Sequence, residues 1–242
     1  MVGRIMSNFE VISFKDRKSL HAAATQRIAG ELMEEVVRCD SPSLFLSGGS
    51  TPGPVYEALS HIDLPWEKVV VGLVDERWVD EDDSGSNAAL VKRTLLKNGA
   101  KGATFVPMKT PHIDPFSGQD AVAESYDSIV SECSFAVLGM GSAGHACSWF
   151  PQAERLENAI DAEFESSVQA IKAKRTDVTG PYLERMTLTK SALAKCKSVL
   201  LLITGETKRK VLDGALNGTD MDLPVSHLLS LKPEQLTIFY AP

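Results

Sequence analysis

One stretch of this chain, LGMGSAGHACSWFP, combines three glycines with a histidine, His145, that follows the last of them. The ordinary pKa of an imidazole is about 6.5, so a histidine can accept a proton from water at neutral pH. The stretch comes directly after the apolar run FAVL, which places His145 in a turn that follows a strand rather than on the apolar face of a helix. We therefore predict that His145 is a general base.

The same stretch matches the G-x-G-x-x-G pattern of dinucleotide-binding loops through Gly139, Gly141 and Gly144. That interpretation requires a long helix starting at the third glycine. Pro151 would interrupt such a helix after about two turns, and the pattern lies past the middle of the chain rather than on its first strand. We interpret the glycines as shaping the turn that presents His145, with Gly141 and Gly144 among the residues that bind the substrate.

A second glycine-rich turn reads SGGSTP and also follows an apolar run. We expect Ser50 or Thr51 to cap the next helix and Pro52 to stand in its first turn. Backbone N–H groups at the start of a helix bind anions, so Gly48, Gly49, Ser50 and Thr51 are predicted to contact phosphate; the alternative is an ordinary strand–turn–helix corner. A Walker loop is excluded because no Gly-Lys-Ser/Thr follows.

Charged residues end a third apolar run, VVVGLV. Asp75 and Arg77 are predicted to face a ligand, Arg77 through a bidentate contact with a phosphate or a carboxylate; the alternative is that Asp75, Glu76 and Arg77 pair with one another. The acidic run at residues 80–83 is interpreted as a solvated turn rather than a metal site. Ser86 is predicted to cap a helix, and Asn87 either reaches the site or supports that cap.

Two further basic residues, Arg185 and Lys208, stand at strand edges. Lys208 falls in the first turn of a predicted helix, where the helix dipole disfavours a cation. This position indicates a bound anion, with an ordinary surface lysine as the alternative. We predict that Arg77, Arg185, Lys208 and the turn 48–51 hold a phosphate, while His145 acts on another part of the same small molecule without a metal.

The elements that must position these residues alternate short apolar runs with amphipathic stretches. Runs such as VVVGLV and SVLLLI are typical of strands that helices cover on both faces. We predict a single α/β domain over residues 1–242, with three layers formed by a mostly parallel Rossmann-like sheet and helices on both faces; ligands bind such sheets beyond the carboxyl ends of the strands. Predicted strands span residues 9–14, 43–46, 69–74, 104–107, 135–138, 167–171, 199–203 and 236–240. Predicted helices span residues 16–39, 51–61, 86–98, 119–133, 190–195 and 206–216, and the acidic stretch 152–165 is interpreted as irregular.

Bulk properties exclude several classes of protein. The chain has 242 residues, of which 43% are hydrophobic, and a net charge of −7, which favours a folded core and argues against nucleic acid as a partner. Because Cys39, Cys133, Cys147 and Cys196 lack C-x-x-C spacing, we expect neither a metal site nor a disulfide framework. No apolar run reaches transmembrane length and residues 1–14 lack a signal-peptide core, so we expect a cytoplasmic protein with no membrane partner. We also expect a monomer, because no coiled-coil pattern is present.

Five stretches, LSGGSTP, VDERWV…SN, LGMGSAGHACSWFP, RMTLT and ITGETK, follow one another between residues 46 and 208. In this order they resemble the 6-phosphogluconolactonase family, part of a larger group that includes glucosamine-6-phosphate deaminases. The resemblance implies hydrolysis of 6-phospho-D-glucono-1,5-lactone to 6-phosphogluconate, in the oxidative pentose phosphate pathway and without a cofactor. It also implies that His145 activates the attacking water and that Arg185, Lys208 and the turn 48–51 hold the phosphate, with Arg77 nearby. Backbone N–H groups of the turn 139–144 are expected to stabilise the oxyanion.

The chain departs from the family pattern at Ala143, where an aspartate is usual. An aspartate two residues before His145 could orient the imidazole and stabilise its protonated form. Either Asp75 or Glu76 supplies that carboxylate, or the activity is weakened. Two alternatives stay open: a non-catalytic sugar-phosphate sensor, suggested by Ala143, and a deaminase-like isomerase, which usually carries Asn-Glu-Pro where this chain has Trp-Phe-Pro at 149–151.

Overall fold

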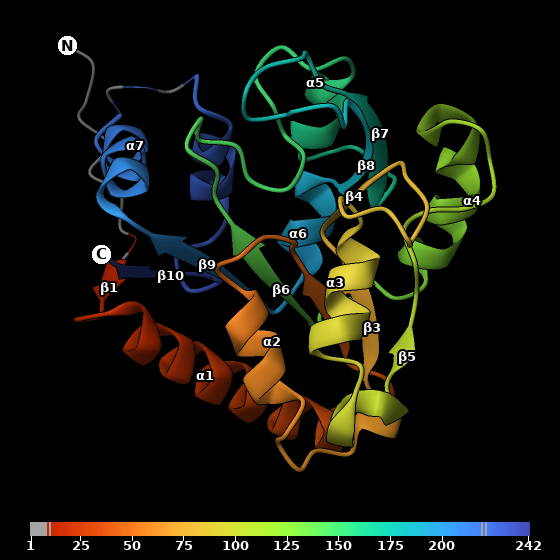
Figure 1. Cartoon of the computed structure of the whole chain (residues 1–242), viewed down its shortest axis with the longest axis vertical. Helices are drawn as coiled ribbons and strands as arrows, with labels where there is room; N and C mark the ends of the chain where they lie inside the picture. Colours follow the sequence, from red (N-terminus) through yellow and green to blue (C-terminus); the bar gives the residue numbers. More distant parts are fainter. Residues whose placement is uncertain (1–8, 10, 219, 221) are drawn as a thin grey trace.

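A parallel sheet of seven strands runs through the middle of the molecule in the computed structural model, which describes residues 9, 11–218, 220 and 222–242 (Figure 1). Every pair of neighbouring strands in it is parallel. This confirms the predicted fold class. In spatial order the strands are β1 (Val11–Ser13), β10 (Leu236–Ala241), β9 (Ser198–Thr204), β6 (Ser134–Gly139), β2 (Ser43–Leu46), β3 (Val70–Leu73) and β5 (Thr104–Phe105).

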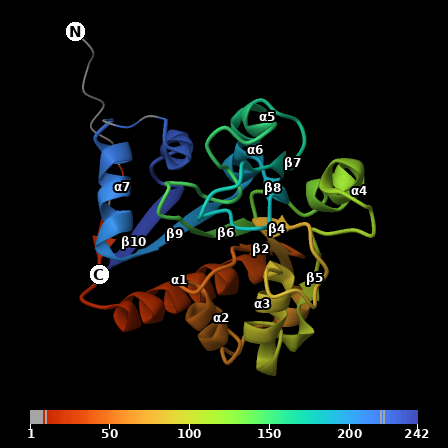
Figure 2. The same ribbon diagram turned by 45° about the horizontal axis from the view of Figure 1, so that its top comes forward.

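Helices cover both faces of this sheet (Figure 2). On one face lie α1 (Arg17–Arg38), α2 (Gly53–Leu59) and α3 (Asn87–Thr94), and on the other α5 (Leu156–Ile160), α6 (Lys190–Lys195) and α7 (Glu206–Leu216). All residues of β2 and β9 are therefore buried, which explains why both strands are apolar apart from a serine or threonine at their ends. The remaining helices are α4 (Pro115–Asp127) and the 3₁₀ segments η1 (Trp66–Lys68), η2 (Asn98–Gly102) and η3 (Pro224–Ser230).

A second, antiparallel sheet was not anticipated from the sequence. It consists of β4 (Asp75–Arg77), β8 (Glu184–Leu188) and β7 (Val168–Lys172), and α4 packs against β7. Of these strands only β7 was predicted. The triplet DER of β4 is charged and shows no alternation of apolar and polar residues, so it forms a strand only because it pairs with β8. The register places Arg77 directly opposite Arg185. Like charges at opposite positions destabilise a sheet, so this pairing requires a negative charge nearby, and Asp75 Oδ2 lies 3.9 Å from Arg185 Nη1.

Three local expectations are wrong. Neither Ser50 nor Thr51 caps α2, whose N-cap is Pro52 with no side-chain hydrogen bond. The helix expected at 119–133 runs instead from Pro115 to Asp127, because Asp114 caps it by accepting a hydrogen bond from Ser117 N at 2.8 Å. The stretch expected to be irregular contains α5.

The cysteines also differ from expectation, because Cys39 and Cys133 form a disulfide. Cys39 follows α1 and Cys133 immediately precedes β6, so 94 residues separate them in the sequence and only the sheet topology brings them together. Spacing along the chain could not show this. The two other cysteines, Cys147 and Cys196, are buried and free.

Two expectations concern membranes and secretion. No helix in the described part of the chain is long and apolar enough to cross a membrane. The signal-peptide inference rests on residues 1–14, of which 1–8 and 10 lie outside the described residues.

The buried carboxylate of Glu76 fixes the start of α3. Its two oxygens accept hydrogen bonds from the backbone N–H groups of Arg77, Asn87 and Ala88, each at 2.8 Å, and from the Ser86 hydroxyl at 3.2 Å. Ser86 is also the N-cap, as predicted, since its hydroxyl accepts from Ala89 N. Glu76 is therefore a structural anchor that sets the position of Asn87.

Replacement of Glu76 by alanine should lower the free energy of unfolding by about 2–4 kcal/mol, because several buried N–H groups lose their acceptor together. Urea unfolding of the purified variant measures this. The matched control is Glu81→Ala, which removes only an exposed ion pair with Lys92 and should cost less than about 1 kcal/mol. Equal costs for the two variants would contradict the anchoring role.

Candidate active site

A pocket of about 230 Å³ opens at the carboxyl ends of four adjacent strands, β9, β6, β2 and β3. After β2 the chain adds β3 and then β5 on one side of β2, whereas β6 pairs on the other side of β2. The pocket therefore lies where the strand order reverses. All but one of the predicted site residues line it: Gly48, Gly49, Ser50, Thr51, Asp75, Arg77, Asn87, Gly141, His145, Arg185 and Lys208. The exception is Gly144, which is buried behind the turn and accepts a hydrogen bond from Val225 N.

The turn after β6 closes on itself and holds His145 at the pocket. Gly141 N donates to the His145 carbonyl at 2.9 Å, and Gly144 N donates to the Gly141 carbonyl at 3.0 Å. A Cβ atom on Gly141 would overlap the imidazole, so only glycine fits there. No helix starts at Gly144, as a dinucleotide loop would require. The N–H groups of Gly141 and Gly144 are occupied within the turn, so an oxyanion donor from residues 139–144 would have to be another N–H group of this turn.

The imidazole of His145 is mostly removed from water. Its Nδ1 is buried and has no hydrogen-bond partner among the described residues, which leaves Nε2 to meet a ligand. Its ring packs on Phe150 with the ring centroids 4.3 Å apart. Burial lowers the pKa of His145 to about 4; the positive charges of Arg185, Lys208 and Arg77 act in the same direction, and Asp75 opposes them. His145 is therefore neutral at pH 7 and can accept a proton.

Asp75 is the carboxylate that faces this histidine. Its Oδ2 accepts a hydrogen bond from the Ser148 hydroxyl at 2.5 Å, and its Oδ1 accepts one from Asn87 Nδ2 at 3.1 Å. Arg185 Nη1 lies 3.9 Å from Oδ2. Of the two acids considered for His145, Glu76 is committed to α3, so only Asp75 can stabilise a protonated imidazole.

Arg185 is held almost completely inside the protein by backbone carbonyls. Its Nε donates to the Tyr182 carbonyl at 2.9 Å, its Nη2 donates to the Thr179 carbonyl at 3.3 Å, and its guanidinium lies over the Phe150 ring. Burial lowers the pKa of Arg185 to about 10, so the side chain keeps its positive charge at pH 7. Phe150 thus packs against both the base and this cation.

Arg77 and Lys208 add two more cations to the pocket. Arg77 Nη1 donates to the Gly85 carbonyl at 2.5 Å. Burial lowers the pKa of Lys208, and the charge of Arg17 at the start of α1 lowers it further. Three cations and one carboxylate line the pocket, so the pocket is suited to an anion.

The glycine-rich turn after β2 supplies hydrogen-bond donors. A Cβ atom on Gly48 would overlap the Asn87 side chain, so glycine is required for this close approach. Within the described residues, the backbone N–H groups of Gly48, Gly49 and Ser50 donate to no protein acceptor. These donors face the same pocket as the three cations, which is the arrangement of a phosphate site.

The chain has relatives among known protein families. Residues 15–238 match the family described as glucosamine-6-phosphate isomerases/6-phosphogluconolactonase. The chain belongs to this family. A 6-phosphogluconolactonase from Mesorhizobium japonicum is 34% identical over 234 residues, which cover 95% of this chain and 94% of that protein. One from Caulobacter vibrioides is 33% identical over 95% of this chain and 96% of its own length.

Solved structures of the family have the same fold. The crystal structure of a 6-phosphogluconolactonase from Shewanella baltica matches this chain with a TM-score of 0.91 at 33% identity, covering 99% of this chain and 100% of the other. A putative 6-phosphogluconolactonase from Neisseria gonorrhoeae gives a TM-score of 0.84 at 31% identity, covering 97% and 100%. The chain is an enzyme of this family.

Several residues near the site were missed from the sequence. Ser148 and Phe150 lie beside the predicted base, and their spacing from His145 carries no signal of its own. Cys147 lines the pocket with a φ of 50°, a left-handed conformation that few non-glycine residues adopt. Arg17 acts on the site from α1, about 190 positions before Lys208 in the chain, so only the fold could reveal it.

Replacement of Lys208 by glutamine should weaken the binding of inorganic phosphate about 10-fold or more, because a charge-assisted hydrogen bond contributes roughly 1.5–3 kcal/mol. The measurement is the rise in melting temperature with phosphate concentration. Lys210→Gln is the matched control, since Lys210 lies on the same helix but is exposed and does not line the pocket. Equal phosphate binding by the two variants would exclude Lys208 from the anion site.

Proposed function

We propose that the chain hydrolyses 6-phospho-D-glucono-1,5-lactone to 6-phosphogluconate. One observation carries the proposal: a neutral, partly buried histidine shares a pocket with three cations and a turn of free N–H groups. An anion-binding region beside a base is what a phosphorylated substrate with a second reactive centre requires. The family membership and the names of the relatives agree with this substrate.

The substrate phosphate would bind Arg185, Lys208 and the N–H groups of the turn 48–51, with Arg77 nearby. Arg185 is preorganised for this role because backbone carbonyls fix its side chain before any ligand arrives. A bound phosphate would also compensate the like charges of Arg77 and Arg185 on paired strands.

His145 would act on the lactone carbonyl. Its Nε2 takes a proton from a water molecule, the water oxygen attacks the carbonyl carbon, and the ring oxygen leaves and takes a proton back from the imidazolium. Asp75 lowers the energy of the imidazolium through its negative charge. The cations around the pocket stabilise the negative charge that develops on the carbonyl oxygen.

The structure offers little support for the isomerase branch of the family. Where those proteins are expected to carry an acidic residue, this chain has Trp149 and Phe150, and both are buried in the core. A non-catalytic sensor has one observation in its favour, the unpartnered Nδ1 of His145, since Ala143 cannot accept a hydrogen bond from it. The same pocket would then bind the sugar phosphate without turning it over.

The first test is the His145→Ala variant. The lactonase rate, after subtraction of spontaneous ring opening, should fall by about 10²–10⁴-fold, while the affinity for 6-phosphogluconate changes little. His61→Ala, a change at an exposed histidine far along the chain, is the control and should keep full activity. Wild-type activity in His145→Ala would disprove its role as the base. A wild-type protein that binds 6-phosphogluconate but has no lactonase activity would favour the sensor.

The second test is Ala143→Asp. A carboxylate beside the imidazole favours its protonated form, so it should raise the pKa of His145 and hold the ring in a productive orientation. The wild-type rate should fall only when the pH drops toward about 4, where His145 becomes protonated. In the variant this acid limb should move to higher pH, and kcat/KM above it should increase.

Two pH–rate profiles, each corrected for the uncatalysed reaction, measure this effect. Ala143→Asn is the matched control, because it adds a side chain of the same size without the charge and should leave the apparent pKa near the wild-type value. If the aspartate variant has the same rate and the same apparent pKa as the wild type, residue 143 is only a turn residue.

A further inference from the structure

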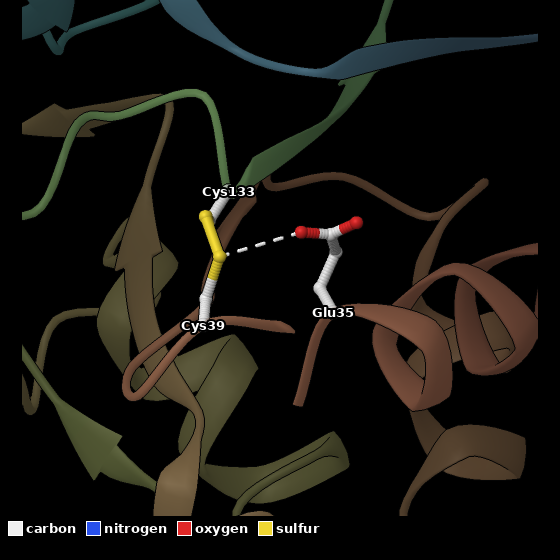
Figure 3. Close-up of side chains that lie close together, drawn as sticks. All are labelled: Glu35, Cys39 and Cys133. Atoms are coloured by element: carbon white, nitrogen blue, oxygen red, sulfur yellow. Dashed lines mark hydrogen bonds between the residues drawn. A yellow bond between two sulfur atoms is a disulfide. The ribbon is translucent and has the colours of Figure 1, made fainter. Parts of the chain in front are cut away.

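A second cluster of reactive side chains lies at the amino ends of the central strands, whereas the pocket lies at their carboxyl ends. Figure 3 shows Cys39 and Cys133 joined by a disulfide, with the carboxylate of Glu35 beside them. Cys133 precedes β6 at its amino end, and its carbonyl accepts a hydrogen bond from Ser43 N at the start of β2. The two Cα atoms are 6.5 Å apart. The pairing of β2 with β6 therefore keeps the cysteines within bonding distance, whether or not they are bonded.

Glu35 gives the reduced state a hydrogen-bond acceptor. Its Oε2 lies 3.4 Å from Cys39 Sγ, a distance at which a Cys39 thiol donates a hydrogen bond to it. A disulfide has no such proton. Lys197 and Arg38 pair with the other carboxylate oxygen, so the buried charge of Glu35 is compensated in both states. Neither the thiol nor the disulfide form leaves this carboxylate without partners.

The pair is also accessible to small molecules. Both cysteines are partly exposed and line a cavity of about 610 Å³, large enough for a tripeptide-sized ligand. Four cationic side chains and three carboxylates line it, and Arg38 and Lys197 among the cations are the partners of Glu35. The cations are Arg38, Lys195, Lys197 and Lys232, and the carboxylates are Glu35, Glu132 and Glu234. The four cations of the lining attract anionic reagents to the pair.

The two other cysteines are poor competitors for such a reaction. Burial raises the pKa of Cys196 to about 12, and it also raises the pKa of Cys147. The thiolate is the reacting species, so these two residues stay as thiols when Cys39 and Cys133 react.

We propose that Cys39 and Cys133 are a reversible thiol–disulfide pair that exchanges with small anionic disulfides of the glutathione type. One cysteine thiolate attacks glutathione disulfide and releases one glutathione; the second cysteine then attacks the mixed disulfide and releases the other. The protein loses two electrons and two protons, and one glutathione disulfide becomes two glutathione thiols. The closed loop contains the segments from β2 to α4, so the bond restricts a large part of the unfolded chain.

The experiment compares the full chain after equilibration with dithiothreitol and with glutathione disulfide. Oxidation should lower the number of titratable thiols in the denatured protein from four to two and remove two hydrogens from its mass. The melting temperature should rise by roughly 5–15 °C, and dithiothreitol should reverse the change. Neither readout depends on lactonase activity, so the result is independent of the proposed function.

Variants identify the residues responsible. Cys39→Ser and Cys133→Ser should each abolish the difference in melting temperature between the two conditions, while Cys196→Ala should keep it. Equal melting temperatures for the oxidised and reduced wild type would overturn the proposal, and so would a stable mixed disulfide with glutathione. Because the Glu35, Cys39 and Cys133 ligand atoms lie within 4.8 Å of one another, the reduced protein is also titrated with Zn²⁺ alone. Tight one-to-one binding of Zn²⁺ that prevents oxidation would also overturn the proposal and would identify these residues as a metal site.

Discussion

The burial of Asp75 is the constraint on which the site depends. A carboxylate removed from water is costly unless hydrogen bonds and positive charges surround it. Its partners come from three other segments: Asn87 from α3, Ser148 from the turn that carries His145, and Arg185 from the small sheet. Each of these segments must be in place for the carboxylate to be satisfied. The base, the helix start and the buried arginine are therefore positioned together.

The same charges decide both the ligand and the state of the base. Burial is the main reason that His145 is neutral, and the three cations add to it. Cations that prepare the pocket for an anion thus also keep the imidazole ready to accept a proton. A bound phosphate dianion would offset part of their field and raise the pKa of His145 toward its ordinary value. Under the proposed function, substrate binding and the basicity of His145 are therefore coupled, and a phosphate-free analogue would meet a weaker base.

The sequence was informative wherever a single segment determines the outcome. The bounds of β2 and α7 agree with prediction, because the apolar run of β2 and the amphipathic pattern of α7 can each be recognised within a single segment. The position of the site followed from one topological rule, since the carboxyl ends of parallel strands meet at one edge. Features that form when distant segments pair were not predicted. β4 is a strand only because it pairs with β8, and Ser148, which donates a hydrogen bond to Asp75, lies 73 positions further along the chain. The failed cap at Thr51 has a similar cause, because its hydroxyl lies 3.3 Å from that of Thr204 on β9.

Strand β6 connects the two chemical centres and also separates them. Cys133 stands before its first residue, and the turn with His145 follows its last. A strand of six residues spans roughly 20 Å, and β6 is buried between β2 and β9 along its length. A strand held on both sides cannot shift along its axis without breaking its hydrogen bonds to both neighbours. A covalent change at its amino end therefore acts on the unfolded chain, whose freedom it reduces, and leaves the geometry around His145 as it was. By this argument, the chain can couple its stability to the thiol–disulfide balance around it without changing the chemistry at the pocket.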